Sequence, residues 1–315
     1  MTPEIDLSPW IAAQAAQAPA LARAAREVGR LEATLAALTP AEAQGAHQRL
    51  ALSEVEAMLW AQGIILRRDE IGRDLMAARA DADPEAMRLA RWAVRRLDGQ
   101  GAQTDLAAFL GLQRRAAGEP PQIAGLNLRV QGDAFAAAAA GFLARVSALA
   151  DLDPLARGPL VAVLWRVAGL SPPEQLVEPA IWAARHMAQD SDGLRFVVLG
   201  RHGRRVWPGI GTAADRLAAH LRAVASGAHE GRAMIRRIAA WGTRARAATA
   251  AVKGDNAARV IAVLAARPLV SALEAEAQAG VSRPTAERML RRLSDLGLIR
   301  EVTGHRRFRL WTAAA

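Results

Sequence analysis

The last fifth of the chain carries an ordered series of helix caps, apolar periods and chain breakers that few folds can satisfy. Residues 257–266 predict a short apolar helix, and Pro268 breaks it. Ser271 predicts the N-cap of a second helix, and Gly280 supplies a sharp turn after it. Ser282 then predicts the N-cap of a third helix. The segment therefore indicates a helix followed by a helix–turn–helix.

The third helix of this series is amphipathic. Apolar residues recur at steps of three and four, which places them on one side of a helix: Ala286, Met289, Leu290, Leu293 and Leu296. The other side carries charged and polar residues, with some near the edges: Arg283, Thr285, Arg288, Arg291, Arg292 and Asp295. Gly297 predicts the end of the helix. The pattern indicates a helix with one buried side and one arginine-bearing side.

A β-hairpin is predicted to follow this helix. Residues 298–302 and 307–311 read as two strands, and residues 303–306 as the tight turn between them. A helix, a helix–turn–helix and a basic hairpin in this order define a winged helix. The sequence therefore predicts a winged helix-turn-helix domain over residues 257–315.

A winged helix of this kind suggests a DNA-binding function. A recognition helix places its N-terminal residues in the major groove, where arginine and short polar side chains reach phosphates and base edges. The residues predicted to do so are Ser282, Arg283, Thr285, Arg288, Arg291 and Arg292. The predicted wing tip, expected on phosphates or in a minor groove, is His305, Arg306 and Arg307. We therefore predict duplex DNA as the partner and transcriptional regulation as the function, with a symmetric homodimer as a further expectation.

The distribution of charge favours the same interpretation. The formal net charge is +10, but residues 1–200 contribute −3, residues 201–253 contribute +9 and residues 254–315 contribute +4. Such an asymmetry predicts that the C-terminal third faces an anionic partner, of which nucleic acid is the most common. The segment 201–253 could also extend the contact with DNA or form a dimer surface.

Composition bounds the remaining possibilities. The chain has no cysteine, which excludes disulfides, cysteine-ligated metals and thiol nucleophiles. No apolar stretch is long enough to span a bilayer, and Glu4 and Asp6 stand where a signal peptide would be basic, so we expect a cytoplasmic protein without a membrane partner. The six histidines lie far apart, and we predict neither a metal site nor a cofactor.

The first 250 residues predict a helical domain. Alanine, leucine and arginine dominate and tyrosine is absent, so we expect a mainly α fold with a helical domain at 1–252, a linker at 253–256 and the winged helix after it. The predicted helices cover 10–38 (as one or two helices), 41–60, 68–80, 84–97, 104–115, 133–149, 158–169, 172–189, 212–224 and 230–252. Residues 194–199 are the predicted strand. The tryptophans expected in the core are Trp60, Trp92, Trp165, Trp182 and Trp241.

Two resemblances add to this interpretation. Residues 281–299 read VSRPTAERMLRRLSDLGLI and resemble the recognition-helix segments of GntR- and MarR-type bacterial regulators. The longer run is similar to Fic-domain proteins that end in a winged helix, and closer still to a group of bacterial, often plasmid-borne, helix-turn-helix proteins of unknown function. Three stretches carry that second likeness: RLAAHLRAV at 216–224, RPLVS at 267–271 and REVTGHRRFRLW at 300–311.

The resemblance to Fic proteins implies a lost activity. It places DPLARGPLV, residues 153–161, at the family's catalytic loop, whose pattern is His-Pro-Phe-x-acid-Gly-Asn-Gly-Arg. Asp153 then replaces the general-base histidine, Arg157 the metal-binding acid, Pro159 the asparagine and Val161 the phosphate-binding arginine. Likewise SEVEA at 53–57 resembles the inhibitory Ser-x-Ile-Glu-Gly helix, with Glu56 as its glutamate.

Nucleotidyl transfer needs a base, a cation and an anion cradle together, so we expect no enzyme activity. Two alternatives stay open: a divergent Fic-like nucleotidyl transferase that uses other residues, and an adaptor that binds protein through its winged helix. The motif GIGTAA at 209–214 matches a dinucleotide-binding fingerprint only loosely. We interpret it as a helix entry capped by Thr212.

Overall fold

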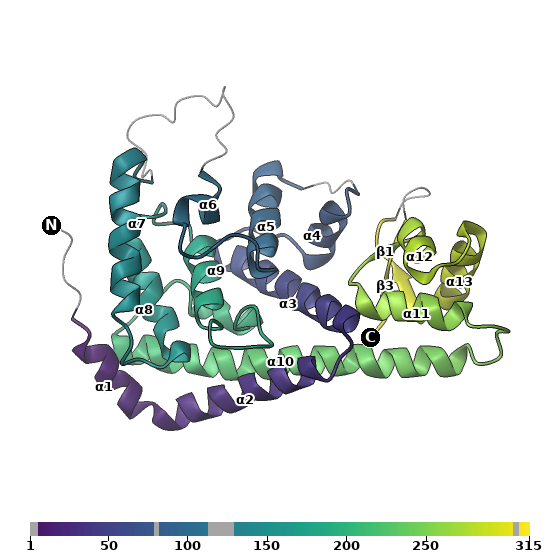
Figure 1. Ribbon diagram of the computed structural model, residues 1–315, viewed down its shortest axis with the longest axis horizontal. Helices are drawn as coiled ribbons and strands as arrows, with labels where there is room; N and C mark the ends of the chain where they lie inside the picture. Colours follow the sequence, from purple (N-terminus) through teal and green to yellow (C-terminus); the bar gives the residue numbers. More distant parts are fainter. Residues whose placement is uncertain (1–5, 79–81, 113–128, 305–308) are drawn as a thin grey trace.

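One helix of 36 residues, α10 (Ala213–Ala248), runs along most of the molecule and connects its two regions (Figure 1). At 1.5 Å per residue it is about 54 Å long. The computed structural model describes residues 6–78, 82–112, 129–304 and 309–315. We call residues 6–248 of this description the body and residues 256–315 the C-terminal module.

The continuity of α10 corrects the prediction of two helices at 212–224 and 230–252. Gly227 lies between the two predicted helices, and both it and Gly231 are buried within the single helix. A Cβ on Gly227 would lie 2.4 Å from the carbonyl oxygen of Val198, so this glycine allows another segment to approach closely instead of ending the helix. The helix begins as predicted, because Thr212 and Asp215 form a capping box.

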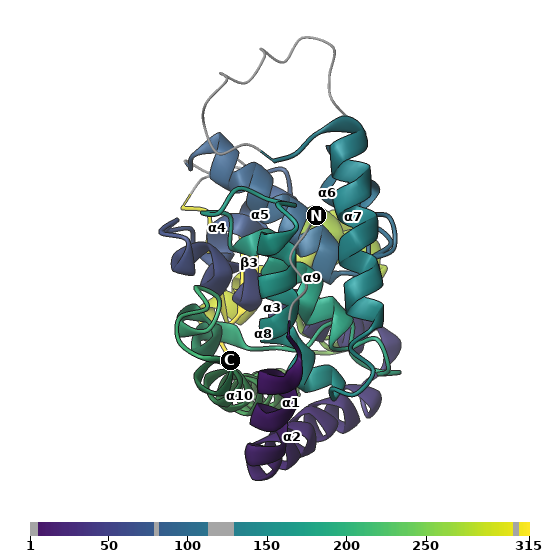
Figure 2. The same ribbon diagram turned by 90° about the vertical axis from the view of Figure 1, so that its left-hand side faces the viewer.

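The body is a set of helices, of which some pack against α10 and most others lie above it in the view of Figure 1 (Figures 1 and 2). Its elements are α1 (Ser8–Ala16), α2 (Ala18–Ala36), α3 (Pro40–Ala61), α4 (Arg68–Leu75), α5 (Pro84–Leu97), α6 (Leu106–Leu110), α7 (Gly132–Ser147), α8 (Pro154–Val167), α9 (Val177–His186) and the 3-10 helix η2 (Gly200–Arg205). α1, α2, α8 and η2 pack directly against α10, and α3 packs against η2. None of the helices in the described part of the chain is both long and apolar enough to cross a membrane.

The C-terminal module has the predicted order of elements. These are α11 (Asn256–Ala266), β1 (Val270–Ser271), α12 (Ala272–Ala279), α13 (Arg283–Asp295), β2 (Ile299–Glu301) and β3 (Leu310–Ala313). The strands form an antiparallel sheet in the order β1-β3-β2, with Ile299 opposite Ala313 and Val270 opposite Trp311. The mainly α fold with a small C-terminal sheet is thus confirmed. Strand β1, between α11 and α12, was not predicted.

Local caps explain why the module folds as its sequence predicts. Ser271 and Glu274 form a capping box at the start of α12. Gly280 ends α12 in the left-handed region at φ 61°, and Gly297 follows α13 at φ 66°. Each of these signals depends on residues no more than a few positions apart.

Each region has its own hydrophobic core. The core of the module contains Trp241 and Ala245, which belong to the last third of α10. The indole Nε1 of Trp241 donates a 2.6 Å hydrogen bond to the carbonyl of Leu298, at the start of the hairpin. The predicted linker at 253–256 lies at the turn between α10 and α11. The domain division at this point stays a prediction, and the module's core reaches upstream of it.

A buried arginine joins the two regions. Arg49 of α3 donates hydrogen bonds of 2.5–2.8 Å to the carbonyls of Leu264, Ala265 and Arg267, at the C-terminal end of α11. Burial lowers the pKa of Arg49 to about 10, so the side chain stays charged at neutral pH. One turn earlier, a Cβ on Gly45 would stand 2.1 Å from the carbonyl oxygen of Ala266. α3 therefore caps α11 with a positive charge at close range.

Other parts of the body also differ from the sequence prediction. Residues 194–199 form no strand; their apolar side chains fill the core while the backbone bonds elsewhere, as from Val197 N to the carbonyl of Ala184 at 2.9 Å. Trp60 is 50% exposed, because it stacks against the guanidinium of Arg204 at 4.3 Å at the surface. Helix α8 starts at residue 154 and includes a proline at 159.

Candidate nucleic-acid interface

Helix α13 separates its apolar and basic residues between two sides. Ala286, Met289, Leu290 and Leu293 are buried in the core of the module, as the sequence predicted. Leu296, which was expected beside them, is 47% exposed, because it is the C-cap residue and lies beyond the last turn of the helix. The apolar side thus fixes α13 to the module and leaves the opposite side to solvent.

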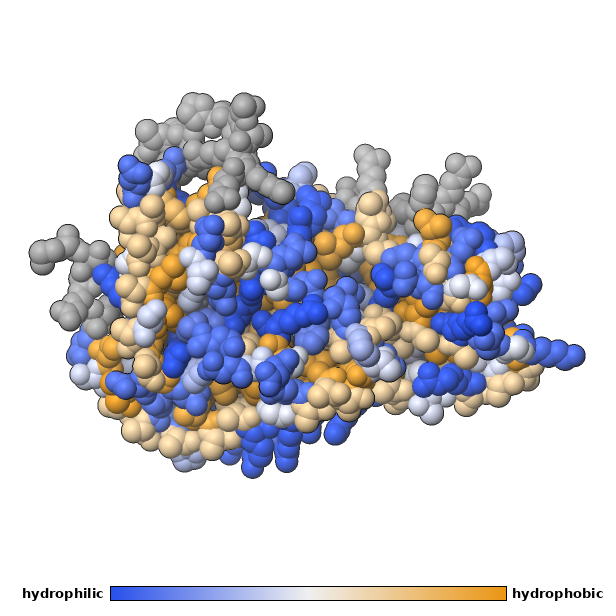
Figure 3. Space-filling model, viewed as in Figure 1, coloured by the Kyte–Doolittle hydropathy of each residue, from blue (hydrophilic) through white to orange (hydrophobic). Residues whose placement is uncertain are grey.

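The arginines of α13 are exposed. Arg288, Arg291 and Arg292 follow one another at intervals that keep them on the solvent side, and none forms an ion pair with another described residue. Hydrophilic side chains project from this end of the molecule (Figure 3). The surface that was predicted to contact DNA is therefore open among the described residues.

Arg283, the first arginine of the helix, differs from these three because it forms ion pairs. Its Nε lies 2.7 Å from a carboxylate oxygen of Glu287, and its Nη1 lies 3.8 Å from one of Glu276 on α12. The first of these pairs is partly exposed and therefore weak. Arg283 must leave both carboxylates before it can bind a phosphate or a base edge.

Two hydroxyl groups lie at the N-terminus of α13. Ser282 is the N-cap residue by its backbone, as predicted, but its side chain accepts no hydrogen bond from the helix. Instead the hydroxyls of Ser282 and Thr285 are hydrogen bonded to each other at 3.0 Å. The free N–H groups of the first turn and this hydroxyl pair form the type of helix terminus that binds phosphate in other proteins.

The predicted wing contacts His305, Arg306 and Arg307 lie outside the described residues. The preceding part of the hairpin is held by Glu301, whose carboxylate accepts hydrogen bonds from the backbone N–H of Thr303 at 2.8 Å and of Gly304 at 2.9 Å. The start of the turn is therefore fixed to β2.

The segment compared with the Fic catalytic loop is built into the start of α8. Asp153 is the N-cap, and its carboxylate accepts a 2.8 Å hydrogen bond from the backbone N–H of Leu155. Arg157 donates to the carbonyl of Leu152 at 2.8 Å, and Pro159 and Val161 are buried. These four residues cap α8 or pack its first turns.

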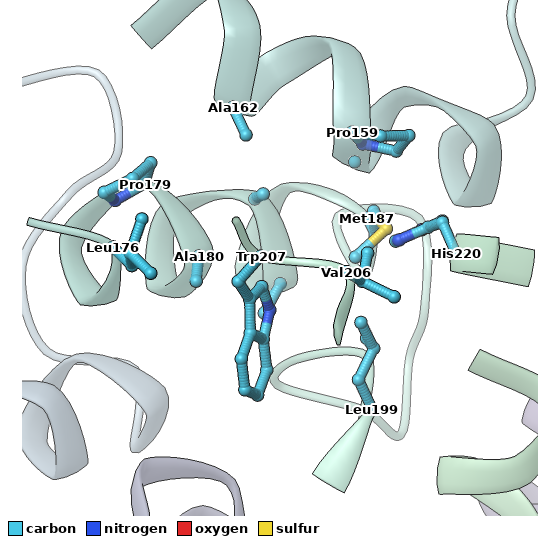
Figure 4. Close-up of a pocket in the computed structure, with 13 residues that line it drawn as sticks. Pro159, Ala162, Leu176, Pro179, Ala180, Met187, Leu199, Val206, Trp207 and His220 are labelled. Carbon is cyan, nitrogen blue, oxygen red and sulfur yellow. The ribbon is translucent and has the colours of Figure 1, made fainter. Parts of the chain in front are cut away.

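A pocket beside this segment is small and mostly apolar (Figure 4). Its volume is about 30 Å³, enough for one or two water molecules. Gly158 allows the ring of His220 and the sulfur of Met187 to approach, since a Cβ there would lie 2.7 Å from each. Burial lowers the pKa of His220 to about 4, so its neutral ring donates from Nε2 to the carbonyl of Leu155 at 3.0 Å. The side chains of His220 and Met187 therefore occupy the space beside Gly158.

A buried carboxylate in α3 was missed by the sequence interpretation. That interpretation singled out Glu56, which accepts a 3.3 Å hydrogen bond from the backbone N–H of Arg68 near the surface. Glu54 is instead fully buried and accepts hydrogen bonds from the backbone N–H groups of Leu199 at 3.1 Å and Gly200 at 2.6 Å. Burial raises its pKa to about 7. Glu54 stands between Ser53 and Val55, only two residues before Glu56, so the sequence does not distinguish the buried carboxylate from the more exposed one.

Comparisons with known proteins support the Fic resemblance at the level of the fold. No protein-family model matches the chain, and no curated protein does. Among solved structures, the chain is similar to a Fic family protein from Desulfovibrio desulfuricans G20. The TM-score is 0.50 and the identity is 13%, over 94% of this chain and 96% of that one. The chain therefore has a distantly Fic-like fold. The resemblances to winged-helix regulators and to the plasmid-borne group stay predictions.

Proposed function

We propose that this protein binds duplex DNA through α13 and acts as a transcriptional regulator. One observation carries the proposal: Arg288, Arg291 and Arg292 are exposed together on the side of α13 opposite its buried residues. In a helix-turn-helix protein this is the side that enters the major groove. The hydroxyls of Ser282 and Thr285, and Arg283 once released, would contact the same groove. The wing residues 305–307 would reach the backbone beside it.

We propose further that the Fic-like body carries no nucleotidyl transferase activity. This rests on the roles of the residues at 153–161, which cap and pack α8, and on the small apolar pocket beside them. A general base, a cation ligand and an anion cradle have no counterpart among these residues. The body would then serve as a scaffold for the DNA-binding module.

Titration of fluorescent duplexes with the full chain over a salt series tests the DNA proposal. We expect affinity to fall steeply with salt, as it does when arginines displace counterions from phosphates. The variant Arg288→Ala with Arg292→Ala should reduce the slope of log K against log salt by about 2 if both contact phosphate. On a site selected from random duplexes, the loss should be about tenfold or more for each arginine that reads a base.

The matched control replaces Arg88 and Arg95 with alanine, two exposed arginines on α5 of the body. This control removes the same charge and should leave the slope unchanged. Equal effects of the two double variants would mean that only net charge matters. Absence of salt-dependent binding by the wild type would overturn the proposal and favour the protein-binding adaptor. Transfer of label from ATP to the chain or to another protein would overturn the second proposal.

A further inference from the structure

The last third of α10 has a free side that the rest of α10 lacks. Before residue 232, buried residues occur on several sides of the helix, because α1, α2, α8 and η2 pack around it. After Ile235, the buried residues of α10 are Trp241 and Ala245, which face the C-terminal module, and Gly242, which lines a groove beside α3. The opposite side of this part is exposed.

This free side is basic. Between Glu230 and Asp255 the sequence contains six cationic residues and no acidic one. One of the six, Arg232, is largely buried and lies 3.6 Å from a carboxylate oxygen of Glu27. The other five are exposed and form no ion pair with a described residue, and we call them the α10 basic face: Arg236, Arg237, Arg244, Arg246 (which also lines a groove beside α3) and Lys253.

The charge on this face decides between possible partners. A second copy of the chain would bring the same five positive charges against these, which disfavours a symmetric dimer here. An amphipathic helix that binds a membrane surface exposes large apolar side chains beside its basic ones. Here the exposed residues among the arginines are alanines and a threonine, such as Ala240, Thr243 and Ala247. A polyanion that needs only positive charge fits this face best.

The length and the position of the face agree with a duplex. Arg236 and Arg246 are ten residues apart, or about 15 Å along the helix, while the phosphates of DNA supply one charge per about 1.7 Å of axis. α11 packs against both α10 and α13, and the end of α10 lies at the same end of the molecule as α13 (Figure 1). The turn that contains Lys253 connects α10 directly to the module.

We infer that the α10 basic face is a second contact with DNA, one that binds backbone phosphates without regard to sequence. The inference rests on the proposed function and adds a division of roles to it. α13 supplies discrimination between sequences, and the α10 basic face supplies affinity for any duplex. Arginine and lysine are interchangeable in such a role, because a phosphate contact needs the charge and no fixed pair of donors.

The test compares three triple variants on a mixed-sequence duplex and on a selected site. Arg236→Ala, Arg237→Ala and Arg244→Ala together should reduce the salt slope by about 2 to 3 and weaken binding to both duplexes by the same factor. The ratio of the two affinities should not change. Lysine at the same three positions should restore the slope. Alanine at Arg88, Arg95 and Arg145, on α5 and α7, is the charge-matched control and should leave the slope at its wild-type value.

The outcomes separate this inference from the proposed function. If the wild type binds no duplex, the proposed function fails and the inference fails with it. If the wild type binds and the alanine triple variant keeps the full slope, the inference alone is overturned. A loss confined to the selected site would also overturn it, since that result would make the face a reader of sequence. Binding of the wild type to anionic vesicles that is lost in the alanine triple variant, with DNA binding unchanged, would assign the face to a membrane surface instead.

Discussion

The two regions of the molecule treat polar side chains in opposite ways. The body buries charged or titratable groups, among them Arg49, Glu54, His186 and His220. The C-terminal module, within the described residues, buries only apolar side chains and the hydroxyl of Thr303. Burial also shifts the pKa values of the body's groups, raising that of Glu54 to about 7 and lowering those of His186 and His220 to about 4.

This difference determines where the charged and polar side chains of each region lie. The module has an ordinary apolar core, so its arginines stay at the surface, where they can meet a partner. The body uses its polar groups for internal contacts between segments that are distant in the sequence, such as Glu54 with Leu199 and Gly200. Stability of the body should therefore depend on pH, while the module should be nearly indifferent to it between pH 5 and 8.

The largest expected effect is at Arg49, a buried charge of the body that bonds to the module. Arg49→Ala leaves the carbonyls of Leu264, Ala265 and Arg267 without their donor at a mostly buried junction. Each unsatisfied group costs about 1–3 kcal/mol, so we expect the free energy of unfolding to fall by about 3–5 kcal/mol in urea denaturation followed by circular dichroism. Arg95→Ala, at an exposed position of α5, is the control. A loss below about 1 kcal/mol would show that water replaces the guanidinium and that the two regions are joined only loosely.

The next effect concerns Glu54 and the pH dependence of the body. In the unfolded chain this carboxyl ionises near its ordinary pKa of 4.5, but in the fold it stays protonated up to about 7. The folded state therefore loses stability as pH rises between these values. Relative to Glu54→Gln, which cannot ionise, the wild type should lose about 2–3 kcal/mol between pH 5 and pH 8. Glu56→Gln, two residues along α3, should show no such difference. Parallel curves for wild type and Glu54→Gln would mean that the carboxylate is stabilised by its N–H donors at all pH values.

The smallest effect tests a surface contact between the regions. Arg300 of β2 lies 2.6 Å from a carboxylate oxygen of Asp69 on α4, with both side chains partly exposed. Asp69→Asn should lower stability by less than about 1 kcal/mol, and the difference should shrink in high salt because solvent screens the pair. Thermal unfolding at two salt concentrations measures it. A loss as large as that of Arg49→Ala would place the main junction at the surface.

The module could be predicted from sequence because its signals are local. Ser271, Gly280 and Gly297 each mark a boundary through neighbours within one or two turns, and the apolar period of α13 fixes its buried side. The same holds for Thr212 at the start of α10. The order of elements and the exposed side of α13 therefore follow from short stretches of the amino-acid sequence.

The body could not be predicted equally well, because its structure depends on contacts between residues that are distant in the sequence. Gly227 resembles a helix breaker until the segment at 198–199 is seen to pack against it. Residues 194–199 have the composition of a strand but no strand partner in the described structure. The roles of Glu54 and Arg49 depend on residues about 145 and 215 positions away. Local patterns in the amino-acid sequence do not predict contacts over such distances.

The continuity of α10 affects how the C-terminal module could be transferred to another protein. Trp241 and Ala245 complete the core around α11 to α13. If the module were transferred to another protein without α10, its core would therefore contain a cavity. A chimeric protein that contains a folded module must therefore include the final turns of α10, from about residue 235 onward. The boundary of the unit that can be exchanged between proteins thus lies inside helix α10 and not in a loop.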